Sequence, residues 1–460
     1  MKAFNLNKQR GQVFVVLAVS MVLLAGAAGL AIDSGLGYLI RGKLNAAVDA
    51  AAVAGARAAA QGETRAEQQA NAIRAARHFF AANYPAGYLG SVATLDAPGV
   101  AFDSPRPGVI TVNASARARV PVTLMGVMGF DMLDISASAE SIRKDLDMAF
   151  VVDTSGSVNP VAAQVRQRSA AFLDRFSAST DRMSLIHFSW GAEVDVPIHT
   201  GSLRGFDKQR VKREIGVYQF SGLTNSAEGF RHGRDQLNRV GPRDRSSMRV
   251  IVFFSDGTPN SFASRFTFRN PAECNRPGVI GTADGMAIGQ PTGLGDHTRQ
   301  NAPAAGACNK DRNISAALAS RGMPDWYNAH HPADREFPIV TSGPRAVTND
   351  TSTPQATWMN VNRASKNLVE AMAAKARAEG IHVFTIGLGP LLKIVNAPDS
   401  MPDDTGENLL KCMANSEDAP QRCKRNSAGH PVGVYCHAET VAGLEPCFAT
   451  LAAEVLRITK

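Results

Sequence analysis

The stretch DMAFVVDTSGS, residues 147–157, decides the fold, because an almost continuous apolar run stops there at a carboxylate followed by hydroxyl side chains. A short run of this kind is typical of a strand buried on both faces of a parallel sheet. The stretch VIVFFSDG, residues 250–257, has the same form and stops at Asp256. Together with the helical patterns between and after these strands, this predicts an α/β domain with a doubly wound, mostly parallel sheet.

Oxygen-bearing side chains fall where these strands end and in the turn SGLTN, residues 221–225, which is typical of a helix start. Because loops at the carboxyl ends of parallel strands share one edge of the sheet, we expect these side chains to meet. The candidate ligands are Asp153, Ser155, Ser157, Thr224 and Asp256. The simpler interpretation is that they are ordinary turn and capping residues.

The ligand chemistry points to a hard cation, since the set contains carboxylate and hydroxyl oxygens and neither Cys nor His. Mg²⁺ takes few protein ligands, keeps waters and leaves an open coordination position. We therefore predict Mg²⁺ at this site, with Mn²⁺ and Ca²⁺ as alternatives. A carboxylate can fill the open position, so the predicted partner is a protein ligand that offers an acidic side chain.

The five positions resemble the metal-ion-dependent adhesion site of the von Willebrand factor type A domain, where Asp-x-Ser-x-Ser is followed by a distant Thr and a distant Asp. All of these positions match in this chain. The resemblance implies a von Willebrand type A-like fold for residues 146–460, with the metal held by the residues named above. It also implies that the domain binds or adheres. We predict that it is not an enzyme, because the sequence offers no carboxylate pair for nucleophile and acid and no Gly-x-Ser-x-Gly elbow.

An uncharged stretch of twenty residues, 13–32, is long enough to cross a bilayer as a helix. Lys2, Lys8 and Arg10 precede it and Asp33 follows it, which predicts a cytoplasmic N-terminus. Residues 1–33 are therefore interpreted as a cytoplasmic tail and a single-pass transmembrane anchor. The alternative is a cleaved signal peptide, with a small-residue site at residues 25–27.

Residues 34–145 have the pattern of a stalk made of helices and strands. Residues 34–60 are rich in Ala and Leu and continue the apolar helix, and a second helix is predicted over residues 64–83, before Tyr84 and Pro85. The stretches VITVNASA, residues 109–116, and LDISASA, residues 133–139, alternate apolar with small or polar residues, as strands do. No chemical site is evident here.

The stretches DSGLGY, residues 33–38, and KLNAAVDAAAVAG, residues 43–55, resemble the N-terminal region of TadG-like proteins of bacterial Flp/Tad pilus assembly. Those proteins also carry von Willebrand type A domains. The resemblance implies a place in the bacterial inner membrane, with the main domain periplasmic or surface-exposed. It also makes Flp/Tad pilus components candidate partners.

The α/β pattern is interrupted at residues 258–357, which are rich in Gly, Pro, Asn and Arg. This insertion leaves the strand that ends at Asp256. It can overhang the open coordination position and select the partner, or it can be a passive excursion, and the sequence does not choose between these two.

The six cysteines all lie in the second half of the chain, which predicts three disulfides and an oxidising compartment. Proximity pairs the first two with each other and the remaining four among themselves. A zinc site is the rival interpretation, but no Cys-x-x-Cys pair occurs. The cysteines are Cys274, Cys308, Cys412, Cys423, Cys436 and Cys447.

Two further function classes are disfavoured by the residues. The formal charge of +8 permits contact with anionic surfaces, but no nucleic-acid motif occurs, so no nucleic acid is predicted as a partner. A Mg²⁺-dependent phosphohydrolase of the haloacid dehalogenase type needs a second Asp two positions after the first, where Ser155 stands. Besides adhesion, a structural scaffold with a stabilising metal remains open.

Overall fold

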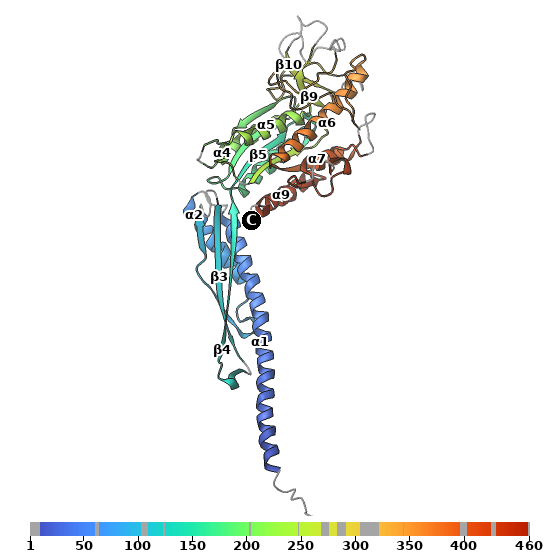
Figure 1. Cartoon of the computed structure of the whole chain (residues 1–460). Coiled ribbons are helices and arrows are strands. Elements are labelled where there is room, and N and C mark those ends of the chain that lie inside the picture. The colour runs from blue at the N-terminus through green and yellow to red at the C-terminus, as the bar shows by residue number, and fades with distance from the viewer. Residues whose placement is uncertain are drawn as a thin grey trace, which may run out of the picture. The chain divides into compact units, whose positions relative to one another are not determined.

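The structure is a computed structural model of the 460-residue chain. It forms two compact units, Met1–Arg143 and Lys144–Thr459, which are described separately (Figure 1). The described residues are 10–59, 64–102, 109–122, 125–201, 204–246, 248–267, 276–282, 291–303, 322–343, 345–395, 403–424 and 429–458.

The first unit is built on one long helix, α1, which runs from Arg10 to Ala58 (Figure 1). Its large apolar side chains between Val13 and Leu24 are exposed, and α1 is long and apolar enough to cross a membrane. The second helix, α2 (Arg65–Asn83), begins with a capping box in which Thr64 and Glu67 each bond the other's backbone N–H. The helix predicted over residues 64–83 is therefore confirmed.

A four-stranded sheet completes this unit, with β3 (Val109–Pro121) at its centre. The short strands β1 (Val92–Leu95) and β2 (Gly99–Phe102) pair antiparallel with successive parts of β3, and β4 (Met132–Lys144) also pairs with β3. A single-turn 3-10 helix, η3 (Tyr88–Gly90), precedes β1, and another, η4 (Met125–Met128), lies between β3 and β4.

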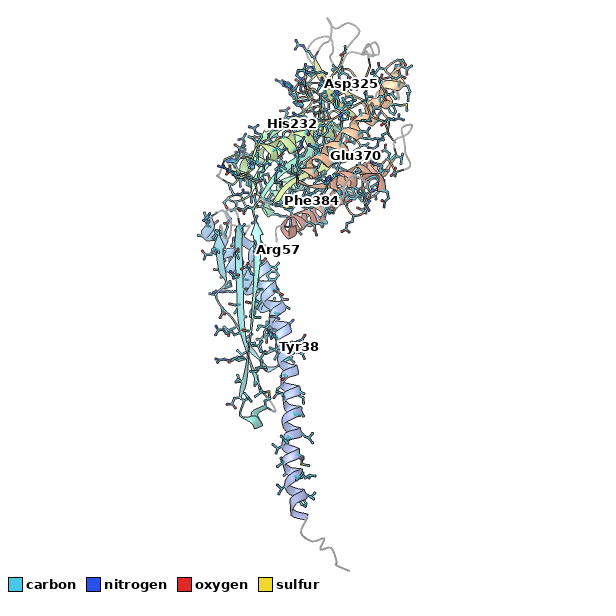
Figure 2. All side chains as sticks on the ribbon, viewed as in Figure 1. Tyr38, Arg57, His232, Asp325, Glu370 and Phe384 are labelled. Atoms are coloured by element: carbon cyan, nitrogen blue, oxygen red, sulfur yellow. A yellow bond between two sulfur atoms is a disulfide. The ribbon has the colours of Figure 1, made fainter. Side chains whose placement is uncertain are left out.

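Alanines let α1 lie close to the sheet in the core of the first unit. Ile40, Leu44 and Ala47 of α1 are buried in the same cluster as Ala116 and Ala118 of β3. The alanine-rich stretch is thus a packed helix face, while other side chains of α1, such as Tyr38, project outward (Figure 2).

The second unit contains a six-stranded sheet in the order β12-β11-β8-β5-β6-β7. All neighbouring strands are parallel except β6 and β7. This confirms the predicted mostly parallel sheet. The strands are β5 (Leu146–Asp153), β6 (Arg182–Phe188), β7 (Ala192–Val196), β8 (Met248–Ser255), β11 (His382–Leu388) and β12 (Tyr435–Ala438).

Helices cover both faces of this sheet, so the fold is doubly wound, as predicted. Met148, Phe150 and Val152 of β5 face α3 (Ala162–Phe172), α4 (Lys208–Val217) and α9 (Leu444–Ile458). Ala149 and Val151 face α5 (Ser226–Arg239), α6 (Pro354–Ala378) and α7 (Gly406–Ala414). Short helical turns join these elements: η5 (Gly156–Val161), η6 (Leu173–Arg175), η9 (Pro390–Lys393), α8 (Gln421–Lys424) and η10 (Val441–Gly443).

The insertion lies between the end of β8 and the start of α6. Its described part contains an antiparallel pair, β9 (Ser261–Arg265) and β10 (Pro277–Gly281), and otherwise irregular chain. Phe262, Val279 and Ile339 from this region are buried in the same core as α5 and α6. The insertion therefore adds to the hydrophobic core of the domain.

Two disulfides occur in the described residues, Cys412–Cys423 and Cys436–Cys447. They agree with the expectation that the last four cysteines pair among themselves. Cys274 and Cys308, which were predicted to pair, lie outside the described residues.

Candidate functional site

The candidate site forms where two adjacent parallel strands, β5 and β8, end. Asp153 is the last residue of β5, and Asp256 follows the last residue of β8. The two strands pair directly, with Val152 opposite Phe254, so their carboxyl ends bring the two carboxylates together. Four of the predicted ligands are buried, Asp153, Ser155, Thr224 and Asp256, while Ser157 is exposed.

Direct hydrogen bonds join the residues from β5 to those from β8. The Ser157 hydroxyl donates to Asp256 Oδ1 at 2.8 Å and lies 3.1 Å from the Ser155 hydroxyl oxygen. The Ser155 backbone N–H donates to Asp153 Oδ1 at 2.8 Å, and the Ser255 hydroxyl donates to Asp153 Oδ2 at 2.5 Å. The structure therefore brings together both carboxylates and both serines of the predicted site.

Thr224 reaches the site through the turn before α5. The backbone N–H of Gly156 donates to Gly222 O at 3.1 Å, so this turn lies against the Asp153–Ser157 loop. The Thr224 backbone N–H donates to Asn260 Oδ1 at 2.9 Å. A Cβ placed on Gly257, the residue after Asp256, would lie 3.7 Å from Thr224 Oγ1. The threonine hydroxyl is thus within van der Waals reach of the chain that carries Asp256.

The two buried carboxylates are electrostatically unsatisfied by protein groups alone. Burial raises the pKa of Asp153 to about 6, although hydrogen bonds from Ser155 and Ser255 oppose this shift. Burial, followed by the charge of Asp153, raises the pKa of Asp256 to about 8. Ionising both carboxylates would place two negative charges in a low-dielectric site, and a bound cation is the usual way to offset that cost.

These residues fit a hard divalent cation. The donor set is oxygen only, it combines two carboxylates with hydroxyls, and its members come from three loops at one edge of the sheet. Ser157 gives the set an exposed side, while Asp153 is fully buried. A cation held here would be reached from solvent on the side of Ser157.

Several residues that support this site were not predicted from the sequence. Ser255 orients Asp153, and Asn260 fixes the backbone of Thr224. Ser255 directly precedes Asp256, so its position at a strand end was a usable signal. Asn260 follows the same strand within a few residues, but nothing in the sequence indicates which backbone N–H it bonds.

The insertion also contacts the candidate site. Gln300 Nε2 donates to Thr154 Oγ1 at 3.1 Å, and Asn301 Nδ2 donates to Ser221 Oγ at 2.8 Å. Thr154 lies between two predicted ligands, and Ser221 begins the turn that carries Thr224. The described residues of the insertion therefore lie beside the loops that carry the predicted ligands.

Comparisons with known proteins find a matching family model and several similar solved structures. No curated protein matches the chain significantly. Similar solved structures include the pilus adhesin SpaC from Lactobacillus rhamnosus GG, with 14% identity, a TM-score of 0.38 and coverage of 80% of this chain and 35% of that chain. The chain therefore spans about a third of the SpaC chain. The PilB minor pilin from Streptococcus sanguinis has 14% identity and a TM-score of 0.38, with 80% and 79% covered.

A third similar structure is the vWF domain of the type V pili tip protein Mfa5 from Porphyromonas gingivalis, with 13% identity, a TM-score of 0.37 and coverage of 70% of this chain and 98% of that chain. The family model of the von Willebrand factor type A domain matches residues 147–276, which span β5, α5, β8 and every residue of the candidate site. Residues 147–276, within the second unit, therefore match the von Willebrand factor type A domain family.

Proposed function

We propose that the second unit is a non-enzymatic binding domain that grips an acidic group of a protein partner through Mg²⁺. The ion would be held by Asp153, Ser155, Ser157, Thr224 and Asp256. The observation that carries this proposal is the convergence of these oxygen-bearing side chains at one sheet edge, with Ser157 exposed above the buried Asp153.

Each residue has a separable task in this proposal. The bound ion supplies positive charge and an open coordination position. Asp153 and Asp256 balance that charge, and Ser255 and the Ser155 N–H hold Asp153 in one orientation. Ser155, Ser157 and Thr224 offer neutral oxygens, which leave part of the positive charge for an acidic partner. Gln300 and Asn301 contribute amide groups beside the loops that carry these ligands.

We further propose that α1 anchors the chain in the bacterial inner membrane, with the binding domain on the periplasmic or outer side. The apolar side chains between Val13 and Leu24 are exposed, as lipid contact requires. Asp33, at the end of the apolar stretch, is buried and accepts a hydrogen bond from the Met125 N–H at 2.7 Å. Phe130 and Met132, beyond that turn, are exposed. The folded part of the first unit thus begins where the apolar stretch ends.

The resemblance of residues 33–55 to TadG-like proteins supports Flp/Tad pilus components as the partners. The test is affinity capture of the full-length protein from its own membranes, in Mg²⁺ and in chelator, with captured proteins identified by mass spectrometry. Ser157→Ala removes one ligand at the exposed side of the site. Ser179→Ala is the matched control, because Ser179 lies before β6, at the opposite edge of the sheet.

A partner captured by wild type and by Ser179→Ala in Mg²⁺, and lost both in chelator and in Ser157→Ala, would support the proposal and identify the partner. An identical set of proteins in all samples would contradict it. That result would favour a structural scaffold, for which the hydrogen bonds between the β5 and β8 loops already offer a basis. Hydrolysis of a phosphate ester by the full-length wild type, lost in Ser157→Ala, would instead favour an enzyme.

A further inference from the structure

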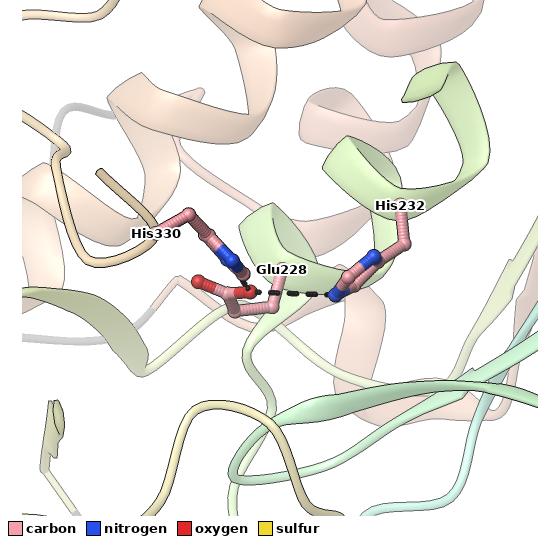
Figure 3. A group of neighbouring side chains, drawn as sticks. All are labelled: Glu228, His232 and His330. Atoms are coloured by element: carbon pink, nitrogen blue, oxygen red, sulfur yellow. Dashed lines mark hydrogen bonds and ion pairs between the residues drawn. The ribbon is translucent and has the colours of Figure 1, made fainter. Parts of the chain in front are cut away.

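A second group of potential ligands lies at α5, apart from the candidate site described above. That first site, with Asp153, Ser155, Ser157, Thr224 and Asp256, is called the oxygen-only site. Glu228 is in the first turn of α5, and His232 follows one turn later on the same side of the helix. His330 comes from the insertion, a hundred residues further along the chain, and points its ring at the Glu228 carboxylate (Figure 3). We call Glu228, His232 and His330 the α5 cluster.

The three side chains are close enough to share one ion. His330 Nε2 lies 2.8 Å and His232 Nε2 lies 3.9 Å from Glu228 Oε2, and one ligand atom from each residue lies within 4.8 Å of the others. Ligand atoms on one tetrahedral zinc are roughly 3.4 Å apart, given bond lengths of about 2.0 to 2.2 Å. The observed distances bracket that value, so rotamer adjustments of the imidazoles can close the site.

The surroundings favour an ion here over an isolated carboxylate. Glu228 is fully buried, whereas His232 and His330 are 20% and 17% exposed, which leaves a path from solvent. A third imidazole, that of His297, stacks edge-on against His330 with 4.9 Å between ring centroids. Tyr327 donates its hydroxyl to Glu228 Oε1, which leaves Oε2 as the oxygen turned toward the histidines.

We propose that the α5 cluster binds a first-row transition metal ion of the Zn²⁺ class. Imidazole and carboxylate together suit such an ion, and a pair of ligands four residues apart on a helix is a common way to hold it. His297 or a water molecule would occupy the fourth position. The oxygen-only site selects a hard cation instead, so the two sites differ in the metal they prefer, and this proposal stands whether or not the first site binds Mg²⁺.

The consequence for the molecule is a link between the insertion and α5. His330 belongs to the insertion, and Glu228 lies four residues after Thr224. A metal bound here would tie the insertion to the helix that begins at the first site. With His297 as the fourth ligand, the same ion would also hold the segment that contains Gln300 and Asn301, at the rim of the first site.

The test uses the full-length protein in detergent, freed of metal by chelator and of any affinity tag. Zinc binding is titrated against a chromophoric chelator, with Mg²⁺ in excess so that the oxygen-only site is filled. His330→Gln is the informative variant, because the glutamine amide can still donate to Glu228 while the imidazole ligand is lost. His331→Gln is the matched control, since this neighbouring imidazole is exposed and accepts a local hydrogen bond from the Ala333 N–H.

We expect wild type and His331→Gln to bind one zinc per chain and to gain thermal stability from it. Substitution of residues that hydrogen-bond to metal ligands lowers metal affinity about 10- to 100-fold. Loss of a ligand itself in His330→Gln should therefore lower zinc affinity more than about 100-fold. Cobalt substitution should give a tetrahedral visible spectrum in wild type that His330→Gln lacks. Equal zinc affinity in wild type and His330→Gln, or no zinc bound by folded wild type, would overturn the proposal and leave a hydrogen-bonded core network.

Discussion

Asp256 and Asp153 set the electrostatics of the candidate site, because both are buried and the charge of Asp153 raises the cost of charging Asp256. The Asp153 carboxylate accepts hydrogen bonds from the Ser255 hydroxyl and the Ser155 backbone N–H. Among the side chains of the described residues, only Ser157 donates a hydrogen bond to the Asp256 carboxylate. Protonation or a bound cation can remove the remaining penalty. A change in pH without metal therefore tests the site directly.

We expect Asp256→Asn to make the metal-free protein more stable at high pH. The pKa of Asp256 is raised from 3.8 to about 8, so the folded protein holds a proton that the unfolded chain releases. Wild-type stability without metal should therefore fall as pH rises from about 4 to about 8, and the penalty is absent below about pH 4. The Asn variant should show a smaller fall, because Asp153, whose pKa is also raised, is still present. The measurement is the thermal midpoint of the full-length protein in chelator across this pH range.

The control for this experiment is Asp174→Asn, which alters an exposed carboxylate paired with Lys212. It should keep the pH profile of the wild type. Added Mg²⁺ should raise the wild-type midpoint most at the alkaline end and should do so less in Asp256→Asn. Parallel pH profiles for wild type and Asp256→Asn would show that Asp256 carries no burial penalty.

The residues of the oxygen-only site could be predicted because each is marked locally. Asp153 and Asp256 end apolar runs, and Thr224 precedes a helix, so strand and turn patterns were enough to place them at one sheet edge. The α5 cluster has no such mark. His330 meets Glu228 only because the insertion packs back on α5, and the path of a Gly- and Pro-rich segment is not encoded by periodicity.

At the scale of elements, the turn before α5 depends on one glycine. Gly222 has φ +91°, a conformation that L side chains rarely adopt, and a Cβ there would lie 2.5 Å from both Ser189 Oγ and Trp190 Cδ1. Trp190 in turn contacts the insertion, since its backbone N–H donates to Gln300 O at 2.9 Å. One residue therefore couples the Thr224 turn, the β6–β7 turn and the insertion.

We expect Gly222→Ala to destabilise the protein by about 1 to 3 kcal/mol, through overpacking against Trp190 and backbone strain. It should also weaken Mg²⁺ binding, because the turn that carries Thr224 must shift. Gly216→Ala is the matched control, since Gly216 lies in helix α4 with nothing within 4 Å of an added Cβ. That change should stabilise slightly, by about 0.5 to 1 kcal/mol. Chemical unfolding and Mg²⁺ titration measure both effects, and equal stability of the two variants would refute the packing argument.

Helix α2 and the first sheet show which elements the sequence reveals. The signals for α2 lie within it, in the Thr64 cap and in the residues before Pro85, so its bounds were predicted within one residue. Strands β1 and β2 are each four residues long, with no contrast strong enough to identify them. Their existence depends on pairing with β3, which is an interaction between distant parts of the chain.

At the scale of the whole molecule, the two disulfides of the described residues lie in the C-terminal part of the second unit. Cys436–Cys447 joins the edge strand β12 to α9, and Cys412–Cys423 joins α7 to α8. An edge strand of four residues has few hydrogen bonds to keep it in place, so a covalent link to the covering helix stabilises it. Disulfides of this kind are typical of proteins in an oxidising compartment.

We expect removal of Cys436–Cys447, by changing both residues to Ala, to cost about 2 to 4 kcal/mol. The comparison is the Cys412→Ala, Cys423→Ala variant, because both disulfides span a sequence separation of 11. Chain entropy alone predicts equal losses, and a larger loss for the first pair would reveal the added cost of releasing β12. Unfolding curves of the full-length protein provide the measurement, and no loss in either variant would contradict a stabilising role.

Helix α1 combines an exposed apolar part with a part packed in the first unit, so membrane retention can be tested without disturbing that core. Leu23 and Leu24 are 68% and 70% exposed, and Leu39, beyond Asp33, is 59% exposed. Each Arg at the centre of a membrane helix costs about 2.5 to 3.5 kcal/mol. We therefore expect the double variant Leu23→Arg, Leu24→Arg to be released from membranes by alkaline extraction, while the Leu39→Arg variant stays bound.

The intact mass of the mature wild type should include residues 13–32. A mature chain that begins after residue 27 would show instead that the apolar stretch is a signal peptide, and the anchoring proposal would fail.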